Sequence, residues 1–316
     1  MNTAQLMIGA VTAFLYGIVV GSFLNVCIYR LPQGESLSSP PSHCPKCQTR
    51  LRPRDLVPLF SFLALRGKCR YCGVSISWRY FTIEFITGLL FTAFWLALAW
   101  QFPDRLATAP FLFIVVMACI FAAAMLVTFM IDLDTTYVIE PVTWVAMAAG
   151  LCFELGSKWL RIEPVAFTIG GLTIPYLPAA VPGMALGFLV FVLMDLFGRL
   201  IFRKPSMGLG DAYIGAAIGA MLGPQLALLS FGIAIIFGAV IGVALMIAGT
   251  LQRRTAPGAE EGKSPEDIEE LPQGTYMPFG PFLTASAVLV ALAPVWVSTH
   301  LAQLWHWWIY QNPFVS

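Results

Sequence analysis

Long apolar segments alternate with shorter polar ones along most of the chain. A membrane-spanning helix needs about 20 mainly apolar residues, and eight segments approach or exceed this length: 5–29, 80–101, 109–131, 139–157, 177–201, 208–222, 225–250 and 279–300. The segment 208–222 is short, and only the turn signal Gly223-Pro224 separates it from the next. The pattern predicts an all-α membrane protein with about eight transmembrane helices.

The composition supports a membrane protein. Hydrophobic residues make up 58% of the 316 residues and charged residues only 11%, whereas soluble domains carry about a quarter charged residues. A net charge of +1 provides no basic field for nucleic acid, so we expect no nucleic-acid partner. The first segment lacks a basic region and a clear cleavage site, so we interpret it as a retained span rather than a signal peptide.

Charge also predicts how the chain is oriented. The longest hydrophilic stretch, 31–79, is strongly basic, and basic loops stay in the cytosol. Eight alternating spans then place both termini outside and the junctions near 132–138, 202–210 and 251–278 in the cytosol. We expect three regions: a first helix over 1–30, a cytosolic loop over 31–79, and a polytopic membrane domain over 80–316 that includes a cytosolic loop over 251–278.

Two CxxC pairs lie in the cytosolic loop 31–79. They are Cys44-x2-Cys47 and Cys69-x2-Cys72, a spacing typical of tetrahedral four-cysteine zinc sites. A disulfide is less consistent with a reducing cytosol. With all four positions filled by protein, such a zinc ion would stabilise the loop rather than catalyse a reaction.

Acidic residues within or beside the apolar segments need an explanation, because a charge in the bilayer costs several kcal/mol. Asp195 and Arg199 are four residues apart, as are Glu154 and Lys158, so each pair can neutralise itself on one helix face. Glu84 lies near the cytosolic end of its span, and its role is open between structure and function.

Asp132 and Asp211 differ from these acids. Asp132 follows the apolar run 109–131, and Asp211 follows Gly208-Leu209-Gly210. The predicted topology brings both to the cytosolic face. Two carboxylates at one site share a proton, which provides the general base and general acid of an aspartic protease. The sequence contains no HExxH motif or nucleophilic-serine motif that would indicate another protease class.

Neighbouring residues refine this site. Gly208 and Gly210 would let the chain turn and let a substrate backbone approach, although glycines also pack helices closely in lipid. Asp134 is an alternative to Asp132, but residues two apart do not share a helix face. Helical spacing would place Glu140 and Ile139 on the face of Asp132, and we favour Asp132.

Six stretches together resemble the bacterial prepilin peptidases, also called type IV leader peptidases, which are GxGD-type intramembrane aspartyl proteases. They cover nearly the whole chain: 21–32, 42–47, 65–72, 131–140, 207–211 and 278–283. This chain has Glu140 where the family usually has Asp, Tyr213 where it usually has Lys, and Phe81 where it usually has Pro.

The resemblance implies cleavage of a short basic leader from type IV prepilins or type II secretion pseudopilins at the cytosolic face of the bacterial inner membrane. It also implies methylation of the new N-terminal amine with S-adenosylmethionine, for which the cysteine loop is the candidate region. Implied partners are the lipid bilayer and the pilus or type II secretion machinery. Three alternatives remain: a peptidase without methyltransferase activity, a catalytically degenerate scaffold, and an ion transporter whose acids bind ions.

Overall fold

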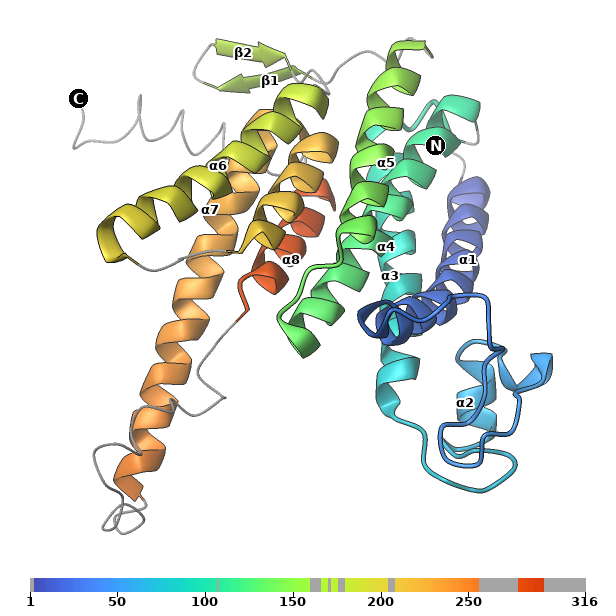
Figure 1. Ribbon diagram of the computed structural model, residues 1–316. Helices are drawn as coiled ribbons and strands as arrows, with labels where there is room; N and C mark the ends of the chain where they lie inside the picture. The colour runs from blue at the N-terminus through green and yellow to red at the C-terminus, as the bar shows by residue number, and fades with distance from the viewer. Residues whose placement is uncertain are drawn as a thin grey trace.

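A computed structural model describes residues 3–106, 108–159, 166–169, 172–175, 180–203, 208–255 and 278–292. Its elements in chain order are the helices α1 (Thr3–Arg30), η1 (Leu31–Gln33), η2 (Pro53–Asp55), α2 (Phe60–Ala64), α3 (Trp78–Gln101), α4 (Ala109–Thr135) and α5 (Glu140–Trp159), the strands β1 (Ala166–Ile169) and β2 (Leu172–Pro175), and the helices α6 (Ala180–Phe202), α7 (Leu209–Thr255) and α8 (Gly280–Leu292). The fold is almost entirely helical, as the hydropathy pattern predicts (Figure 1). The short antiparallel pair β1–β2 has no counterpart in that prediction.

The helices are those of a multi-pass membrane protein. Within the described ranges, five helices are long and apolar enough to cross a membrane: Thr3–Gln33, Trp78–Trp100, Ala109–Thr135, Ala180–Ile201 and Leu209–Leu245. The predicted segment 139–157 corresponds to α5, and 279–300 corresponds to α8 as far as Leu292. The rest of that last segment, and most of the predicted loop 251–278, lie outside the described residues.

Helix α7 is a helical hairpin, because Gly223 interrupts it with φ 72° and ψ 172°. Its two halves contact the same end of α8: Ile214 lies beside Gly280, and Gly238 faces Phe279. The chain therefore reverses at Gly223-Pro224 (Figure 1). The predicted boundary between two apolar segments is confirmed.

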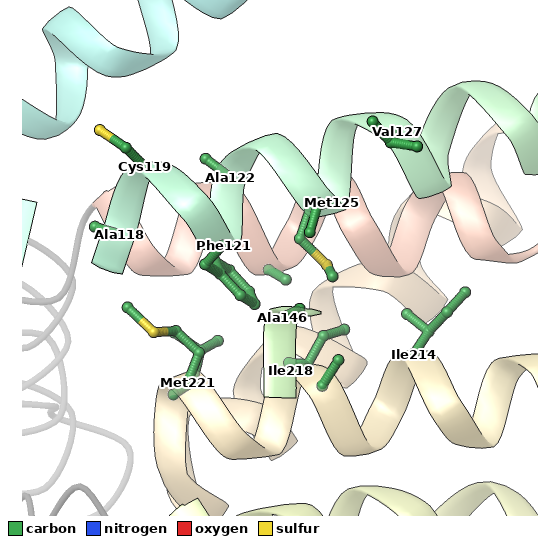
Figure 2. Close-up of a cluster of buried hydrophobic side chains, with 14 of the residues drawn as sticks. Ala118, Cys119, Phe121, Ala122, Met125, Val127, Ala146, Ile214, Ile218 and Met221 are labelled. Carbon is green, nitrogen blue, oxygen red and sulfur yellow. The ribbon is translucent and has the colours of Figure 1, made fainter. Parts of the chain in front are cut away.

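The hydrophobic core forms around α4. Phe121 and Met125 are fully buried and lie among Ala146 of α5 and Ile218 and Met221 of α7 (Figure 2). Helix α4 is thus held on several sides by other helices. This packing fixes the end of α4, where Asp132 lies.

Glycines bring two helix pairs into backbone contact. Gly183 and Gly187 of α6 face Gly219 and Gly215 of α7, and an added Cβ at any of the four would overlap the facing backbone or, at Gly215, the ring of Phe191. Both helices therefore carry the small-xxx-small pattern of close helix packing. In the same way, Gly17 and Gly21 bring α1 against α3.

Candidate active site and metal centre

Asp132 lies in the last turn of α4 and is buried, with 4% of its surface exposed. Its Oδ2 atom has no hydrogen-bond partner among the described residues. A buried carboxylate oxygen without a hydrogen bond costs folding free energy and is rare in positions with a purely structural role. A catalytic role would account for an unpaired oxygen at this position.

Asp211 lies in the first turn of α7, where its backbone N–H donates to the carbonyl of Gly208 (3.2 Å). Asp211 shares a helix face with Ile214, three residues later, and Ile214 approaches Gly280, which itself lies against the Asp132 carboxylate. The start of α7, where Asp211 lies, thus approaches the surroundings of the Asp132 carboxylate through Ile214 and Gly280.

Gly280, the first residue of α8, is the third component of this site. An added Cβ there would overlap Oδ2 of Asp132 and approach Ile214. The sequence analysis included Gly280 in a family motif but gave it no role in the site. The sequence feature that could have pointed to Gly280 is a glycine between Pro278-Phe279 and Pro281 at the start of an apolar segment.

The two glycines before Asp211 differ in their surroundings. An added Cβ at Gly210 would overlap the side chain of Val138, in the connection between α4 and α5. At Gly208 no heavy atom comes closer than 3.8 Å to such a Cβ. Gly210 therefore allows α7 to approach the α4–α5 connection, and Gly208 leaves open space beside the acids.

Asp134 is separated from the pair. Its carboxylate is exposed and forms an ion pair with Arg79, at the start of α3. Residues two apart on a helix face different directions. Asp134 ties α4 to α3 and leaves Asp132 as the buried acid.

The expected shared face of Asp132 and Glu140 is wrong. Helix α4 ends at Thr135, Thr136 adopts a left-handed conformation with φ 58°, and Glu140 begins α5 as an exposed residue. Because the helix does not continue, helical spacing does not relate the two acids. Tyr213, the other departure near the site, packs edge-on against Phe188 of α6 at 5.9 Å.

Glu84 of α3 has a structural partner in the cysteine loop. It is buried, and its Oε2 accepts the backbone N–H of Leu59 at 2.8 Å. Leu59 has a φ of 59°, which is unusual for a residue with a branched side chain. The bond holds the loop in this conformation against α3.

The four loop cysteines form one cluster. Their Sγ atoms lie within 4.8 Å of one another, and those of Cys44 and Cys72 are 3.9 Å apart. Four sulfurs around a zinc ion at about 2.3 Å would be separated by nearly the same distance. None of the four forms a disulfide. The donor set and its spacing therefore fit a tetrahedral metal ion.

The two CxxC turns repeat the same backbone pattern. The N–H of Cys44 donates to Thr49 and its carbonyl accepts from Gln48, while Cys69 pairs in the same way with Val74 and Gly73. Hydrogen bonding with the Thr49 hydroxyl lowers the pKa of Cys47 to about 6, and backbone N–H groups of the second turn lower the pKa of Cys69. One cysteine of each turn thus favours the thiolate, the form that binds metal. At Cys72 a backbone hydrogen bond from Val74 is outweighed by burial and by hydrogen bonds with the other three cysteines, which raise its pKa to about 11.

Asp55 connects the linker between the CxxC pairs to the second pair. It accepts hydrogen bonds from Arg70 (2.6 Å) and from the Tyr71 hydroxyl (2.8 Å). The hydrogen bond from Arg70, followed by that from Tyr71, lowers the pKa of Asp55 to about 2. Sequence reasoning missed this contact, because one acid in a basic loop gives no indication of its partner.

The remaining acids have structural partners. Asp195 and Arg199 form the predicted pair at 2.7 Å. Glu154 accepts the backbone N–H of Ala180 at the start of α6 (2.6 Å). The side chain of Lys158, its predicted partner, lies outside the described part of the chain.

Comparison with known proteins identifies two matching families. The model of the bacterial peptidase A24 N-terminal domain matches residues 15–98, and that of the type IV leader peptidase family matches residues 119–243. The first match contains the cysteine tetrad, and the second contains both aspartates. No solved structure matches the chain with significance.

Several curated proteins are similar over most of the chain. A prepilin leader peptidase/N-methyltransferase of Myxococcus xanthus is 31% identical, covering 92% of this chain and 91% of the relative. One from Neisseria gonorrhoeae is 29% identical, covering 94% and 93%. A type 4 prepilin-like proteins leader peptide-processing enzyme of Escherichia coli is 32% identical, covering 68% and 77%.

Proposed function

Because the chain belongs to the type IV leader peptidase family, we propose that it is an aspartyl endopeptidase that removes the leader from prepilins and N-methylates the new terminus. The observation that supports the peptidase assignment is the approach of Ile214, three residues after Asp211, to Gly280 and the Asp132 carboxylate. The proposed substrates are type IV prepilins or type II secretion pseudopilins. The secretion or pilus machinery is the partner that would receive the product.

The pair has the groups that peptide hydrolysis requires. Two neighbouring carboxylates hold one proton between them. The ionised aspartate takes a proton from water as the water oxygen attacks the scissile carbonyl, and the protonated aspartate donates its proton to the carbonyl oxygen. When the tetrahedral intermediate collapses, the C–N bond breaks and a proton returns to the leaving amine. Space at Gly208 would admit the substrate backbone.

We place the reaction at the cytosolic face of the bacterial inner membrane, with both termini outside. The end of α4, the start of α7 and the start of α8 lie toward the same end of the bundle as the cysteine loop (Figure 1). The excess of Lys and Arg in 31–79 supports a cytosolic position for that loop, and therefore for the aspartates.

We assign a structural zinc ion to Cys44, Cys47, Cys69 and Cys72. The ion would supply a closed cross-link between the two CxxC turns, with no open position for chemistry. Metal analysis tests this directly: the wild-type protein should carry one zinc per chain, and Cys44→Ser or Cys69→Ser should lose it. Wild-type protein prepared without chelator that contains no zinc would refute the assignment.

Methylation requires S-adenosylmethionine as the methyl donor. We retain the loop 31–79 as the region proposed for this second activity. Its separation from the aspartates along the chain leads us to expect independent activities. Variants of the aspartates should still methylate a peptide that has already been cleaved.

One experiment tests the central proposal. Purified protein in nanodiscs is incubated with a prepilin and S-adenosylmethionine, and the products are identified by mass spectrometry. Asp132→Asn and Asp211→Asn should each abolish cleavage, because an amide cannot exchange the proton. Asp134→Asn is the matched control, since Asp134 is exposed and pairs with Arg79, and it should retain cleavage.

The same experiment separates the alternatives. A wild-type product that is cleaved but unmethylated would indicate a peptidase without the second activity. Intact prepilin in every reaction would indicate a degenerate scaffold or a transporter, and ion flux into proteoliposomes would distinguish these two.

A further inference from the structure

The segment that carries α2 exposes apolar side chains although it lies outside the transmembrane helices. Phe60 and Leu63 lie three residues apart in α2, and Val57 precedes the helix and accepts the Ser61 N–H at its carbonyl (3.0 Å). The exposed fractions of Val57, Phe60 and Leu63 are 45%, 63% and 55%. With Leu56, which is also exposed, these three residues form what we call the apolar patch.

The exposed apolar side chains of the patch are separate from the apolar side chain that packs α2 against α3. Phe62, on the opposite side of α2, is buried and contacts the rings of Trp78 at 4.9 Å and Phe81 at 5.5 Å. Helix α2 therefore already has an inner face against α3. Phe60 and Leu63, spaced by three, lie together on its outer face. Because this face is apolar and exposed, it needs a second apolar environment.

The position of this face along α3 indicates the environment. The Leu59 N–H bonds Glu84, which lies six residues after Trp78, the first residue of a membrane-spanning helix. At 1.5 Å per residue this is about 9 Å along the helix axis. Interfacial helices bury their apolar face by about 5–10 Å at the boundary between headgroups and acyl chains. With Trp78 taken as the membrane surface, residues next to Leu59 lie at the depth of that boundary.

The charges around the patch have one sign. Arg52 and Arg54 precede it, Arg66 follows it, and all three are exposed. The acid within this stretch, Asp55, is already bonded to Arg70 and Tyr71. An apolar face bordered by arginines is complementary to a membrane surface that contains anionic lipid.

We propose that the apolar patch inserts into the cytosolic interface of the membrane, with Arg52, Arg54 and Arg66 binding anionic phospholipid headgroups. The cysteine loop is then a monotopic element, held to the bilayer by lipid as well as to α3 by Glu84. This inference does not depend on the proposed catalytic function. Insertion of the patch would hold the cysteine loop at a fixed position at the cytosolic membrane surface, the side on which a substrate helix emerges.

Photo-crosslinking of the full-length protein tests this inference. Phe60 or Leu63 is replaced by p-benzoylphenylalanine, the protein is placed in nanodiscs containing phosphatidylglycerol, and adducts are identified by mass spectrometry after irradiation. Both positions should yield phospholipid adducts. The same residue at Lys46, which is exposed in the first CxxC turn, should yield almost none.

The arginines are tested in the same assay. Nanodiscs of phosphatidylcholine alone, or the combined changes Arg52→Gln, Arg54→Gln and Arg66→Gln, should reduce the phospholipid adducts several-fold. Equal adducts in both lipids would overturn the anionic-lipid component. Absence of lipid adducts at both 60 and 63 would overturn the insertion itself. In that case, adducts to a second chain or to added prepilin would identify a protein occupant instead.

Discussion

The backbone of Gly280, at the start of α8, lies directly against the carboxylate of Asp132, at the end of α4. The contact joins two residues that are far apart in the sequence, one of them without a side chain. Because Oδ2 of Asp132 is buried and unpaired, its position depends on what surrounds it. Gly280 is therefore a positioning residue for the proposed peptidase site.

Gly280→Ala should strongly reduce cleavage. Its methyl group would displace the Asp132 carboxylate, and small displacements of catalytic groups reduce rates by about 100-fold. Cleavage is measured as the initial rate on a prepilin. Methylation of a pre-cleaved peptide reports whether the rest of the protein is intact and should be unchanged.

Gly232→Ala is the matched control for this change. Gly232 lies in the second half of α7, and an added Cβ there meets no heavy atom. The control should cleave at the wild-type rate. A Gly280→Ala variant that does the same would show that the contact has no role.

Glu84 should be replaceable by Gln but not by Ala. Gln keeps an oxygen that accepts the Leu59 N–H, whereas Ala leaves this buried donor unpaired, at a cost of about 1–3 kcal/mol. Hydrogen exchange of residues 56–66 is the measurement. Glu84→Ala should increase exchange in this segment, and Glu84→Gln should resemble the wild type. Equal protection in all three proteins would contradict the role of Glu84 as an anchor for the loop.

The contact of Asp55 with Arg70 should make the loop sensitive to acid. Its folded pKa of about 2 lies below the usual value, so the contact stabilises the folded loop above about pH 4. That stabilisation is lost as the pH falls toward 2. The measurement is hydrogen exchange of the second CxxC turn in metal-free wild-type and Asp55→Asn proteins.

The difference between these two proteins should be present at neutral pH and should shrink on acidification. It should also shrink at high salt, because the Arg70 side chain is exposed to solvent, where ions screen its charge. A difference that stays constant from neutral pH to pH 2 would show that the Asp55 charge does not act through Arg70.

The glycines between α6 and α7 should not tolerate side chains. Gly183→Val would force the side chain into the backbone of Gly219, and overpacking of this kind costs about 1–3 kcal/mol or more. The fraction of protein that remains folded after heating in detergent should fall. Gly242→Val, at a position in α7 with open space, serves as the control and should behave like the wild type apart from a small helix-propensity effect. Equal loss in both variants would place the effect in the helix itself rather than in its packing.

The sequence by itself determined the features that arise from neighbouring residues. Apolar segment length predicted the helices, because hydrophobic thickness limits any spanning helix in the same way, and the turn signal Gly223-Pro224 predicted the reversal. The CxxC spacing predicted the cysteine cluster, since each turn presents two sulfurs locally. The glycines of α6 and α7 also have small-xxx-small spacing, but no contact between them was predicted.

Only the tertiary structure decided which distant groups meet. The approach of Gly280 to Asp132, the pairing of Asp134 with Arg79, and the bond from Leu59 to Glu84 each join different helices or loops. Even the local prediction for Glu140 was wrong, because the chain leaves the helix at Thr136. Such contacts depend on how helices cross and how closely their backbones approach, and the periodicity of a single segment does not contain that information.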